Sequence, residues 1–265
     1  MLTDDQWSVL EPLFQKERTG AGRPQIHSDR EVLNGVLWVL RTGAAWADLP
    51  DRFPSSATCY RRFSKWVKDG RLRKILESLA RHLEDNGLIN LEECFIDGTF
   101  VVAKKGAQKL GKTKRGKGTK LMVIADASGL PIAVYTDSAN PHEVRLVQAT
   151  INEIVTLGRP RRIIGDRAYD SDPLDEALAS QGIELIAPHR KNRKKPATQD
   201  GRLLRRYKRR WKIERLFAWL NKFKKAITRW ERCVERFTAL VHLAFSMILL
   251  SHSGRGKTPT FRWRL

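Results

Sequence analysis

Hydrophobic residues in the first third of the chain recur at spacings of three and four, which is the period of amphipathic helices. Ser28 followed by Glu31 forms the capping-box pattern that begins a helix, and Gly43 is a residue type that commonly ends one. Four helices are expected between residues 1 and 85. The third and fourth of them are predicted over residues 57–69 and 72–83.

The third predicted helix separates basic from apolar side chains. Trp66 falls on its apolar side, whereas Arg61, Arg62 and Lys65 fall on its polar side. A basic helix that follows another helix across a turn is typical of helix-turn-helix proteins, in which it reads DNA bases. The connector, residues 46–54, is longer than the three or four residues usual in that motif. A helical bundle with a solvated basic face therefore stays the alternative.

After residue 90 the pattern changes to short apolar runs bounded by turn residues, which predict β-strands. Helix-like segments follow the third, fourth and fifth runs. The strands are expected at 94–103, 121–126, 130–135, 162–164 and 183–187, and the helices at 143–157, 173–181, 203–223 and 237–252.

This order of elements is that of a ribonuclease H-like (RNase H-like) domain. The predicted fold is therefore α/β, with a mixed five-stranded sheet and helices, preceded by an all-α N-terminal domain of helix-turn-helix type. We expect a helical DNA-binding domain at 1–88, an RNase H-like domain at 89–253 and a basic flexible tail at 254–265.

The charge balance points to a polyanionic partner. The 265 residues include 50 Lys and Arg against 29 Asp and Glu, which gives a formal net charge of +21. Nucleic acid is the simplest partner for such an excess, and an anionic membrane surface is a weaker one. Cys59, Cys94 and Cys233 lie far apart, without the spacing of a zinc site or a disulfide framework. No stretch resembles a signal peptide or a membrane span, so we expect a cytoplasmic protein without a membrane partner.

Three acidic residues stand where a carboxylate is costly. Asp97 and Asp166 each follow a short apolar run, and Glu214 lies in a segment, residues 190–229, with seventeen Lys and Arg and one other acid. Removing a carboxylate from water is unfavourable unless a partner compensates it, and a divalent cation is a common partner. Two such cations form the clamp that many enzymes use on phosphodiesters. These acids therefore indicate metal-dependent chemistry on nucleic acid.

Each acid also has a plainer interpretation. For a single Asp at a strand end, a role in the following turn is the commoner one. For Glu214, a salt bridge with Arg210, four residues earlier on the same helix, is sufficient. Three acids on the expected elements of one fold favour the metal-site interpretation over these alternatives.

The three acids lie in the blocks FIDGT (95–99), IGDRAYD (164–170) and YKRRWKIER (207–215). These blocks resemble the catalytic blocks of DDE transposases from bacterial insertion sequences, most closely insertion-sequence family 5. The resemblance extends from about residue 2 to about residue 250. In the wider superfamily the third block reads Tyr, two residues, Arg, three residues, Glu, six residues, Lys. Tyr207, Arg210 and Glu214 fit this spacing, whereas Asn221 stands at the lysine position, beside Lys222.

The resemblance implies a transposase. It implies that Asp97, Asp166 and Glu214 hold two Mg²⁺ ions, for which Mn²⁺ can substitute. Water would cut DNA at the end of the element, and the freed 3′-hydroxyl would attack target DNA. The implied partners are double-stranded DNA, namely the element's terminal inverted repeats and the target, and further copies of the chain in a homodimer or larger complex.

Further residues are expected around this site. Tyr207 and Arg210 would support Glu214, with Arg210 orienting its carboxylate by a charge-assisted hydrogen bond. His142, in a short segment that also resembles a family motif, would contact a phosphate or a carboxylate, or only cap the helix that follows. Phosphate contacts are expected from the basic loop 112–120 and from Lys208, Arg209, Lys212, Arg215, Lys222, Lys224 and Lys225.

Two other functions stay open. One is a DNA-binding protein without catalysis, derived from a transposase that has decayed or been repurposed. The other is a structure-specific nuclease or RNase H, which shares the acids but has less need of a basic helical N-terminal domain. Magnesium-dependent nicking of element ends distinguishes a transposase from the first, and a comparison of RNA–DNA hybrid with DNA ends distinguishes it from the second.

Overall fold

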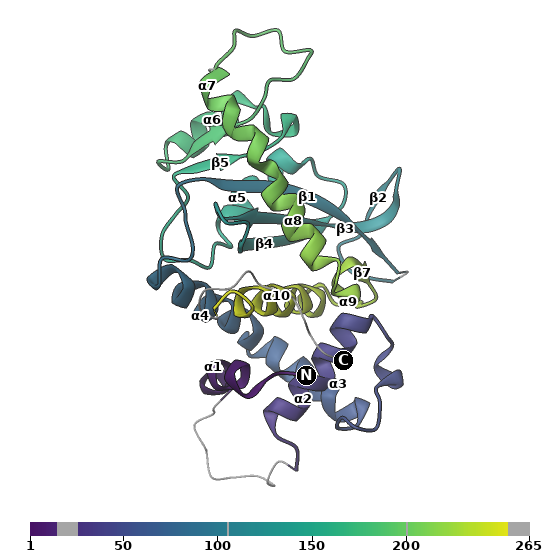
Figure 1. Cartoon of the computed structure of the whole chain (residues 1–265). Coiled ribbons are helices and arrows are strands. Elements are labelled where there is room, and N and C mark those ends of the chain that lie inside the picture. Colours follow the sequence, from purple (N-terminus) through teal and green to yellow (C-terminus); the bar gives the residue numbers. More distant parts are fainter. Residues whose placement is uncertain (15–25, 105, 200, 254–265) are drawn as a thin grey trace.

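A computed structural model describes residues 1–14, 26–104, 106–199 and 201–253. The expected basic tail at 254–265 lies outside the described residues. The described chain forms a mixed β-sheet with helices packed against it and a group of helices from the N-terminal part of the chain at one end (Figure 1).

The four expected N-terminal helices are present. They are α1 (Asp4–Phe14), α2 (Asp29–Thr42), α3 (Ser56–Lys68) and α4 (Arg71–Asp85), with a 3-10 helix, η1 (Trp46–Asp48), between α2 and α3. The capping box of α2 is confirmed, because the Glu31 N–H donates to Ser28 Oγ (3.2 Å) and the Ser28 N–H donates to Glu31 Oε2 (2.7 Å). Helix α2 ends at Gly43, whose φ of 76° is favourable for glycine.

The sheet has seven strands in the described chain, two more than expected. The five expected strands are β1 (Cys94–Ala103), β3 (Gly116–Ala125), β4 (Pro131–Ser138), β5 (Arg162–Ile164) and β6 (Glu184–Ile186). The additional strands are β2 (Gly111–Thr113), which pairs with β3, and β7 (Thr228–Arg229), which pairs with β1. Both are too short to show an alternating apolar pattern. Strand β1 is antiparallel to β3 and parallel to β5, so the mixed sheet and the α/β class are confirmed.

The helices after β4 agree with the expected order but not with every expected boundary. They are α5 (Glu143–Ile151), η2 (Arg167–Tyr169), α6 (Asp172–Ala179), α7 (Gly201–Leu204), η3 (Arg205–Arg210), α8 (Trp211–Leu220), α9 (Lys224–Ile227) and α10 (Val234–Leu250). The single helix expected over 203–223 is wrong, because η3 interrupts it. A 3-10 helix has about three residues per turn, so side chains before and after it do not share the stripe of a continuous α-helix.

Helix α10 joins the two parts of the molecule. It lies between the sheet and the N-terminal helices and contacts both α4 and β4 (Figure 1). Most of its side chains are buried, including the polar residues His242 and Ser246. The N-terminal helices and the sheet therefore share one hydrophobic core, and the domain division at residue 88 stays a prediction. None of the described helices is both long enough and apolar enough to cross a membrane.

Candidate active site

Two of the three predicted acids belong to neighbouring parallel strands: Asp97 lies in β1, and Asp166 lies two residues beyond the end of β5. Phe95 of β1 pairs with Ile164 of β5, and both strands run in the same direction. Asp97 and Asp166 each follow two residues later, so they stand at matching positions beyond this pair. The sheet register thus brings the two aspartates to matching positions, and their convergence on a metal ion stays a prediction.

The carboxyl group of Asp97 is partly buried and surrounded by charges. The pKa of Asp97 is raised to about 6, chiefly by burial and to a smaller extent by the carboxylates of Glu143 and Asp166. The guanidinium of Arg210 opposes this rise through an ion pair between Nη2 and Asp97 Oδ2 (2.8 Å). The Gly98 N–H donates to the other oxygen, Oδ1 (2.8 Å). Both oxygens of Asp97 are thus held in place.

The carboxyl group of Asp166 is oriented by its own turn. Asp166 is the N-cap of η2, and its Oδ1 accepts a hydrogen bond from the Ala168 N–H (2.7 Å). The turn interpretation and the metal-site interpretation are compatible here, because one oxygen fixes the turn and the other is left for a ligand.

Glu214 does not join the two aspartates in this structure. It is exposed on α8, and it makes no hydrogen bond or ion pair among the described side chains. The predicted contact between Arg210 and Glu214 is also absent, because Arg210 pairs with Asp97 instead. Arg210 additionally donates to the hydroxyl of Tyr207 (3.4 Å) and lies over its ring. Arg210 is the last residue of η3 and the N-cap of α8, and its guanidinium lies against β1 through Asp97.

The residue that reaches the aspartates from α5 is Glu143 and not its neighbour. His142 is the exposed N-cap of α5, and its side chain makes no capping hydrogen bond. Glu143 instead influences the pKa of Asp97 and accepts a hydrogen bond from Tyr169. Glu143 is not among the site residues predicted from the sequence, although the resemblance of its segment to a family motif is a signal for it.

Residues 91–250 match the family model described as "Transposase DDE domain". The chain belongs to the DDE-domain transposase family. Residues 2–76 match a second model, "Putative transposase of IS4/5 family". The two matches confirm the predicted family, and the protein is an enzyme of DNA transposition.

Individual relatives agree with this assignment. The putative transposase for insertion sequence element IS402 from Burkholderia cepacia is 32% identical to this chain over 139 residues. The match covers 49% of this chain and 62% of that protein, which is less than two thirds of that protein's length. The putative transposase for IS6501 from Brucella ovis is 31% identical over 134 residues, or 50% of this chain and 98% of that protein. A cryo-EM structure of piggyBac transposase in a synaptic complex with hairpin DNA has a TM-score of 0.54 at 12% identity, covering 97% of this chain and 75% of that one. This likeness supports the fold.

The acids of this transposase fit a divalent metal ion in part. Carboxylate oxygens are the ligands that Mg²⁺ and Mn²⁺ prefer, and Asp97 and Asp166 present them side by side. Within the described ranges, however, no three His, Cys, Asp or Glu side chains are arranged to hold a metal ion. Arg210 supplies the positive charge next to Asp97 in this arrangement. Metal binding at Asp97 Oδ2 therefore requires that Arg210 moves away.

Only part of the predicted DNA-reading face of α3 is exposed. Arg61 and Lys65 lie one helical turn apart on the surface. Arg62 instead donates to the His27 carbonyl (2.7 Å) and pairs with Asp29 of α2. Arg62 is therefore a structural residue in this arrangement, and Arg61 and Lys65 remain as candidates for DNA contacts.

The basic residues of the third block differ in their surroundings. Lys208 and Lys222 are exposed. Arg209 pairs with Glu93, with 2.7 Å between Nη2 and Oε1. Lys212 and Arg215 donate to the carbonyls of Ala127 and Ser128 in the turn before β4, and Arg215 also lies over two tryptophan rings of α8. The loop 112–120 forms a hairpin of β2 and β3.

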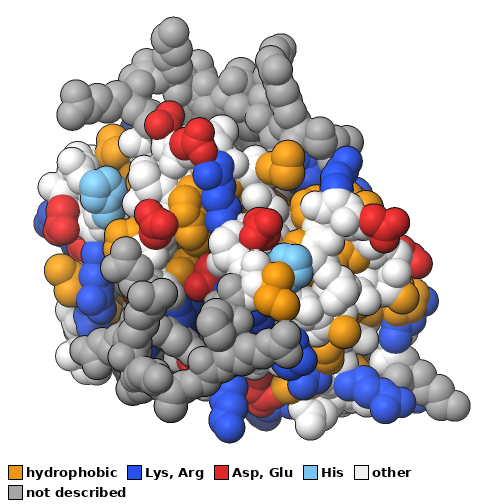
Figure 2. Space-filling view, turned by 90° about the horizontal axis from the view of Figure 1, so that it is seen from below, with side chains coloured by type: hydrophobic (Ala, Val, Ile, Leu, Met, Phe, Trp, Pro, Cys, Tyr) orange, Lys and Arg blue, Asp and Glu red, His pale blue; other side chains and the backbone are white. Residues whose placement is uncertain are grey.

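The end of the molecule formed by the N-terminal helices is not uniformly basic. Figure 2 shows this end from below, and its described basic side chains are scattered among acidic and hydrophobic ones. The charge distribution on this face therefore does not by itself mark a DNA-binding surface.

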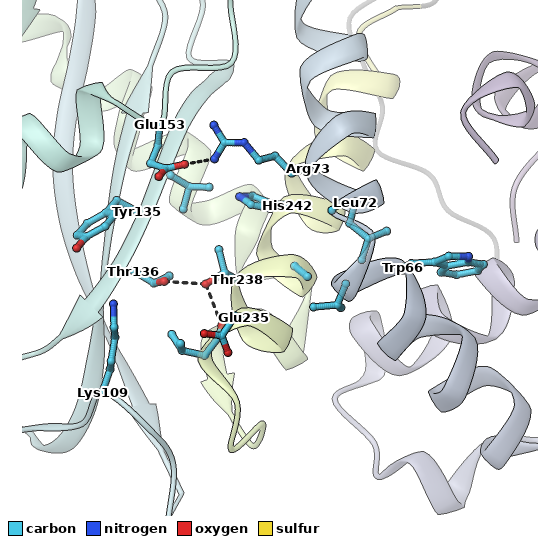
Figure 3. A pocket seen from close by; sticks show the side chains of 15 residues that line it. Trp66, Leu72, Arg73, Lys109, Tyr135, Thr136, Glu153, Glu235, Thr238 and His242 are labelled. Atoms are coloured by element: carbon cyan, nitrogen blue, oxygen red, sulfur yellow. Dashed lines mark hydrogen bonds and ion pairs between the residues drawn. The ribbon is translucent and has the colours of Figure 1, made fainter. Parts of the chain in front are cut away.

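A cavity of about 310 Å³ that none of the site acids lines lies between α3, α4, β4 and α10 (Figure 3). Arg73 of α4 and His242 of α10 are part of its wall, and Arg73 forms an ion pair with Glu153, which follows α5. The cavity marks the junction of the N-terminal helices with the sheet, and its polar contacts hold that junction together.

His242 makes this junction sensitive to acid. Burial, with a smaller contribution from the charge of Arg73, lowers the pKa of His242 to about 3, from 6.5. The folded state keeps His242 neutral, whereas the unfolded state binds a proton there below pH 6.5. The free energy of unfolding therefore has its full value above pH 6.5 and decreases as the pH falls towards 3. At pH 5 the loss is about 2 kcal/mol.

Replacing His242 with leucine is expected to remove this loss. The difference in unfolding free energy between pH 7 and pH 5, measured by urea denaturation, should shrink by about 2 kcal/mol relative to the unmodified chain. The control is His82→Gln on the surface of α4, which should leave the difference unchanged. An equal pH dependence in His242→Leu and the unmodified chain would show that His242 is not the group responsible.

Proposed function

We propose that this transposase cuts DNA at the ends of an insertion sequence and joins the freed strands to target DNA, using two Mg²⁺ ions held by Asp97, Asp166 and Glu214. The observation that carries the proposal is the matching position of Asp97 and Asp166 beyond the paired residues of β1 and β5. Two carboxylates held at adjacent positions, one in a strand and one in the turn directly after its neighbouring strand, are a suitable base for metal-assisted phosphoryl transfer.

The chain's own residues prepare this chemistry. When bound, two divalent ions activate the attacking oxygen and stabilise the leaving oxygen. The N–H groups of Gly98 and Ala168 each fix one carboxylate oxygen, on Asp97 and Asp166 respectively. Arg210 occupies the second oxygen of Asp97, so a metal ion at that oxygen would have to displace Arg210. A movement of η3 and α8 that releases Arg210 also gives Glu214, one helical turn later, a way to approach the aspartates.

The proposed partners follow from charge and from the relatives. A net charge of +21 suits double-stranded DNA, and the relatives are named as transposases for insertion sequence elements, which supports terminal repeats as the substrate. Both ends of an element have to be joined to one target, so a homodimer or larger complex is proposed. The cytoplasm, where bacterial DNA lies, is the proposed location.

The experiment that tests the proposal uses the purified full-length chain with labelled DNA carrying the element's ends, Mg²⁺ and a supercoiled target. Nicked ends and joined products are expected. Binding of the ends without cleavage in Mg²⁺ or Mn²⁺ would instead favour the DNA-binding protein without catalysis. Cleavage of an RNA–DNA hybrid in preference to element ends would favour the nuclease.

The exposed residues of α3 are expected to select the ends. Replacing both Arg61 and Lys65 with alanine should reduce the preference for end DNA over random DNA and lower the slope of log affinity against log salt by about 1.8, since each phosphate contact contributes about 0.9. The full chain is used because α4 shares its core with α10. Fluorescence anisotropy at several salt concentrations measures both quantities.

The matched control is Arg81→Ala on the exposed face of α4, which removes one positive charge outside α3. An unchanged end preference in the double variant would assign end selection to another part of the chain.

A further inference from the structure

Glu143 lies within the candidate active site. It is the first residue of α5, and its carboxylate packs against Gly98, the residue that follows Asp97 in β1. A Cβ atom at position 98 would lie 2.8 Å from both Cδ and Oε1 of Glu143. Such a distance is too short for a van der Waals contact, so a side chain at position 98 would displace this carboxylate.

Tyr169 holds the carboxylate of Glu143. Its hydroxyl donates to Glu143 Oε2 (3.0 Å), and the ring is fully buried in η2, three residues after Asp166. The ring occupies the space above Gly165, where a Cβ atom would lie 2.6 Å from the ring carbon Cδ2. Each site aspartate is therefore adjacent to a glycine whose missing side chain is replaced by one member of the Glu143–Tyr169 pair.

The charges around Glu143 are not balanced by the chain itself. Lys120 Nζ lies 4.0 Å from Glu143 Oε1, at the limit of an ion pair, and it donates to the Pro141 carbonyl (2.6 Å). Arg210 pairs with Asp97 alone. Three carboxylates, those of Asp97, Asp166 and Glu143, thus share two cations, Arg210 and the more distant Lys120, which leaves one negative charge in excess. Like charges at a partly buried site are unfavourable unless a further cation joins them.

We propose that Glu143 is a further carboxylate of the catalytic site, which Tyr169 holds so that it faces the divalent cation together with Asp97 and Asp166. The inference rests on the proposed function, because it needs a metal ion at these two aspartates. It accounts for a carboxylate at position 143, where a purely structural role would be served better by a neutral side chain beside two acids.

The test measures Mn²⁺ binding to the full-length chain without DNA, by electron paramagnetic resonance of the free ion. Glu143→Gln keeps the size of the side chain and its ability to accept the Tyr169 hydrogen bond, but it removes the charge. We expect roughly 10- to 100-fold weaker Mn²⁺ binding. Tyr169→Phe keeps the ring above Gly165 and should weaken Mn²⁺ binding by a smaller factor. Glu176→Gln, the same change at an exposed position of α6, should bind as the unmodified chain does.

The Asp97→Asn variant distinguishes a failure of this inference from a failure of the proposed function. Weakened Mn²⁺ binding in Asp97→Asn with unmodified binding in Glu143→Gln overturns this inference and leaves the proposed function standing. Unmodified binding in both variants overturns the metal site of the proposed function, and this inference with it. If circular dichroism shows that Glu143→Gln does not fold, Tyr169→Phe decides: weaker Mn²⁺ binding supports the role of Glu143, and equal binding overturns it.

Discussion

Replacing Asp97 with asparagine is expected to slow Mg²⁺-dependent nicking of element ends by at least about a hundredfold while DNA binding persists. Asparagine preserves the size of the side chain but carries no negative charge for a cation. Stabilisation of the transition state by a bound metal is worth several kcal/mol, and each 1.4 kcal/mol corresponds to a factor of about ten in rate. The initial nicking rate on end-labelled DNA measures the loss, and anisotropy in the presence of EDTA measures binding.

Two further variants make this result specific. Asp166→Asn should show a loss of the same order, because Asp166 stands at the matching position next to β1. Asp85→Asn, on the exposed end of α4, removes an equal charge elsewhere and should nick DNA at the unmodified rate. Nicking by Asp97→Asn at the unmodified rate would remove Asp97 from the catalytic site, whatever the family resemblance implies.

The sequence predicted the elements that depend on local chemistry. The capping box of α2, the left-handed Gly43 and the five principal strands follow from residue type and period, and the structure confirms them. Asp126, which follows β3, is held by the turn that it begins, since its carboxylate accepts the N–H groups of Ser128 and Leu130 as well as that of the more distant Asn90. Local hydrogen bonding of this kind is fixed by short-range sequence.

The features that the sequence did not predict depend on contacts between distant segments. Helical spacing placed Arg210 with Glu214, but a 3-10 turn and an ion pair with Asp97, more than a hundred residues away, decide its position. Arg62 was grouped with other surface cations, yet Asp29 on a different helix holds it. Glu143 is recognised as a site residue only from the structure, in which side chains of α5 and η2 occupy the space beside the glycines that adjoin the two aspartates. Periodicity carries no information about such pairs.

Glu214 has the largest difference between its predicted role and its observed position. The spacing of the third block assigns it to the metal site, whereas the structure leaves it exposed on α8 and gives Asp97 to Arg210. The predicted role and the observed position of Glu214 are compatible if η3 and α8 rearrange when metal and DNA bind, because Arg210 has to leave Asp97 for a cation to replace it. The energetic cost of that step is the loss of one partly buried ion pair, which the incoming cation offsets.

Replacing Glu214 with glutamine is therefore expected to lower the nicking rate by at least about a hundredfold and to leave stability within about 0.5 kcal/mol, since an exposed side chain without contacts contributes little to folding. Nicking in Mg²⁺ and thermal unfolding without DNA measure the two effects, with Glu176→Gln as the control. A large loss of activity at unchanged stability requires that Glu214 acts in a bound state that differs from the free one. Unmodified nicking by Glu214→Gln, together with an inactive Glu143→Gln, would instead assign the third acid to α5, because Glu143 already lies beside both aspartates.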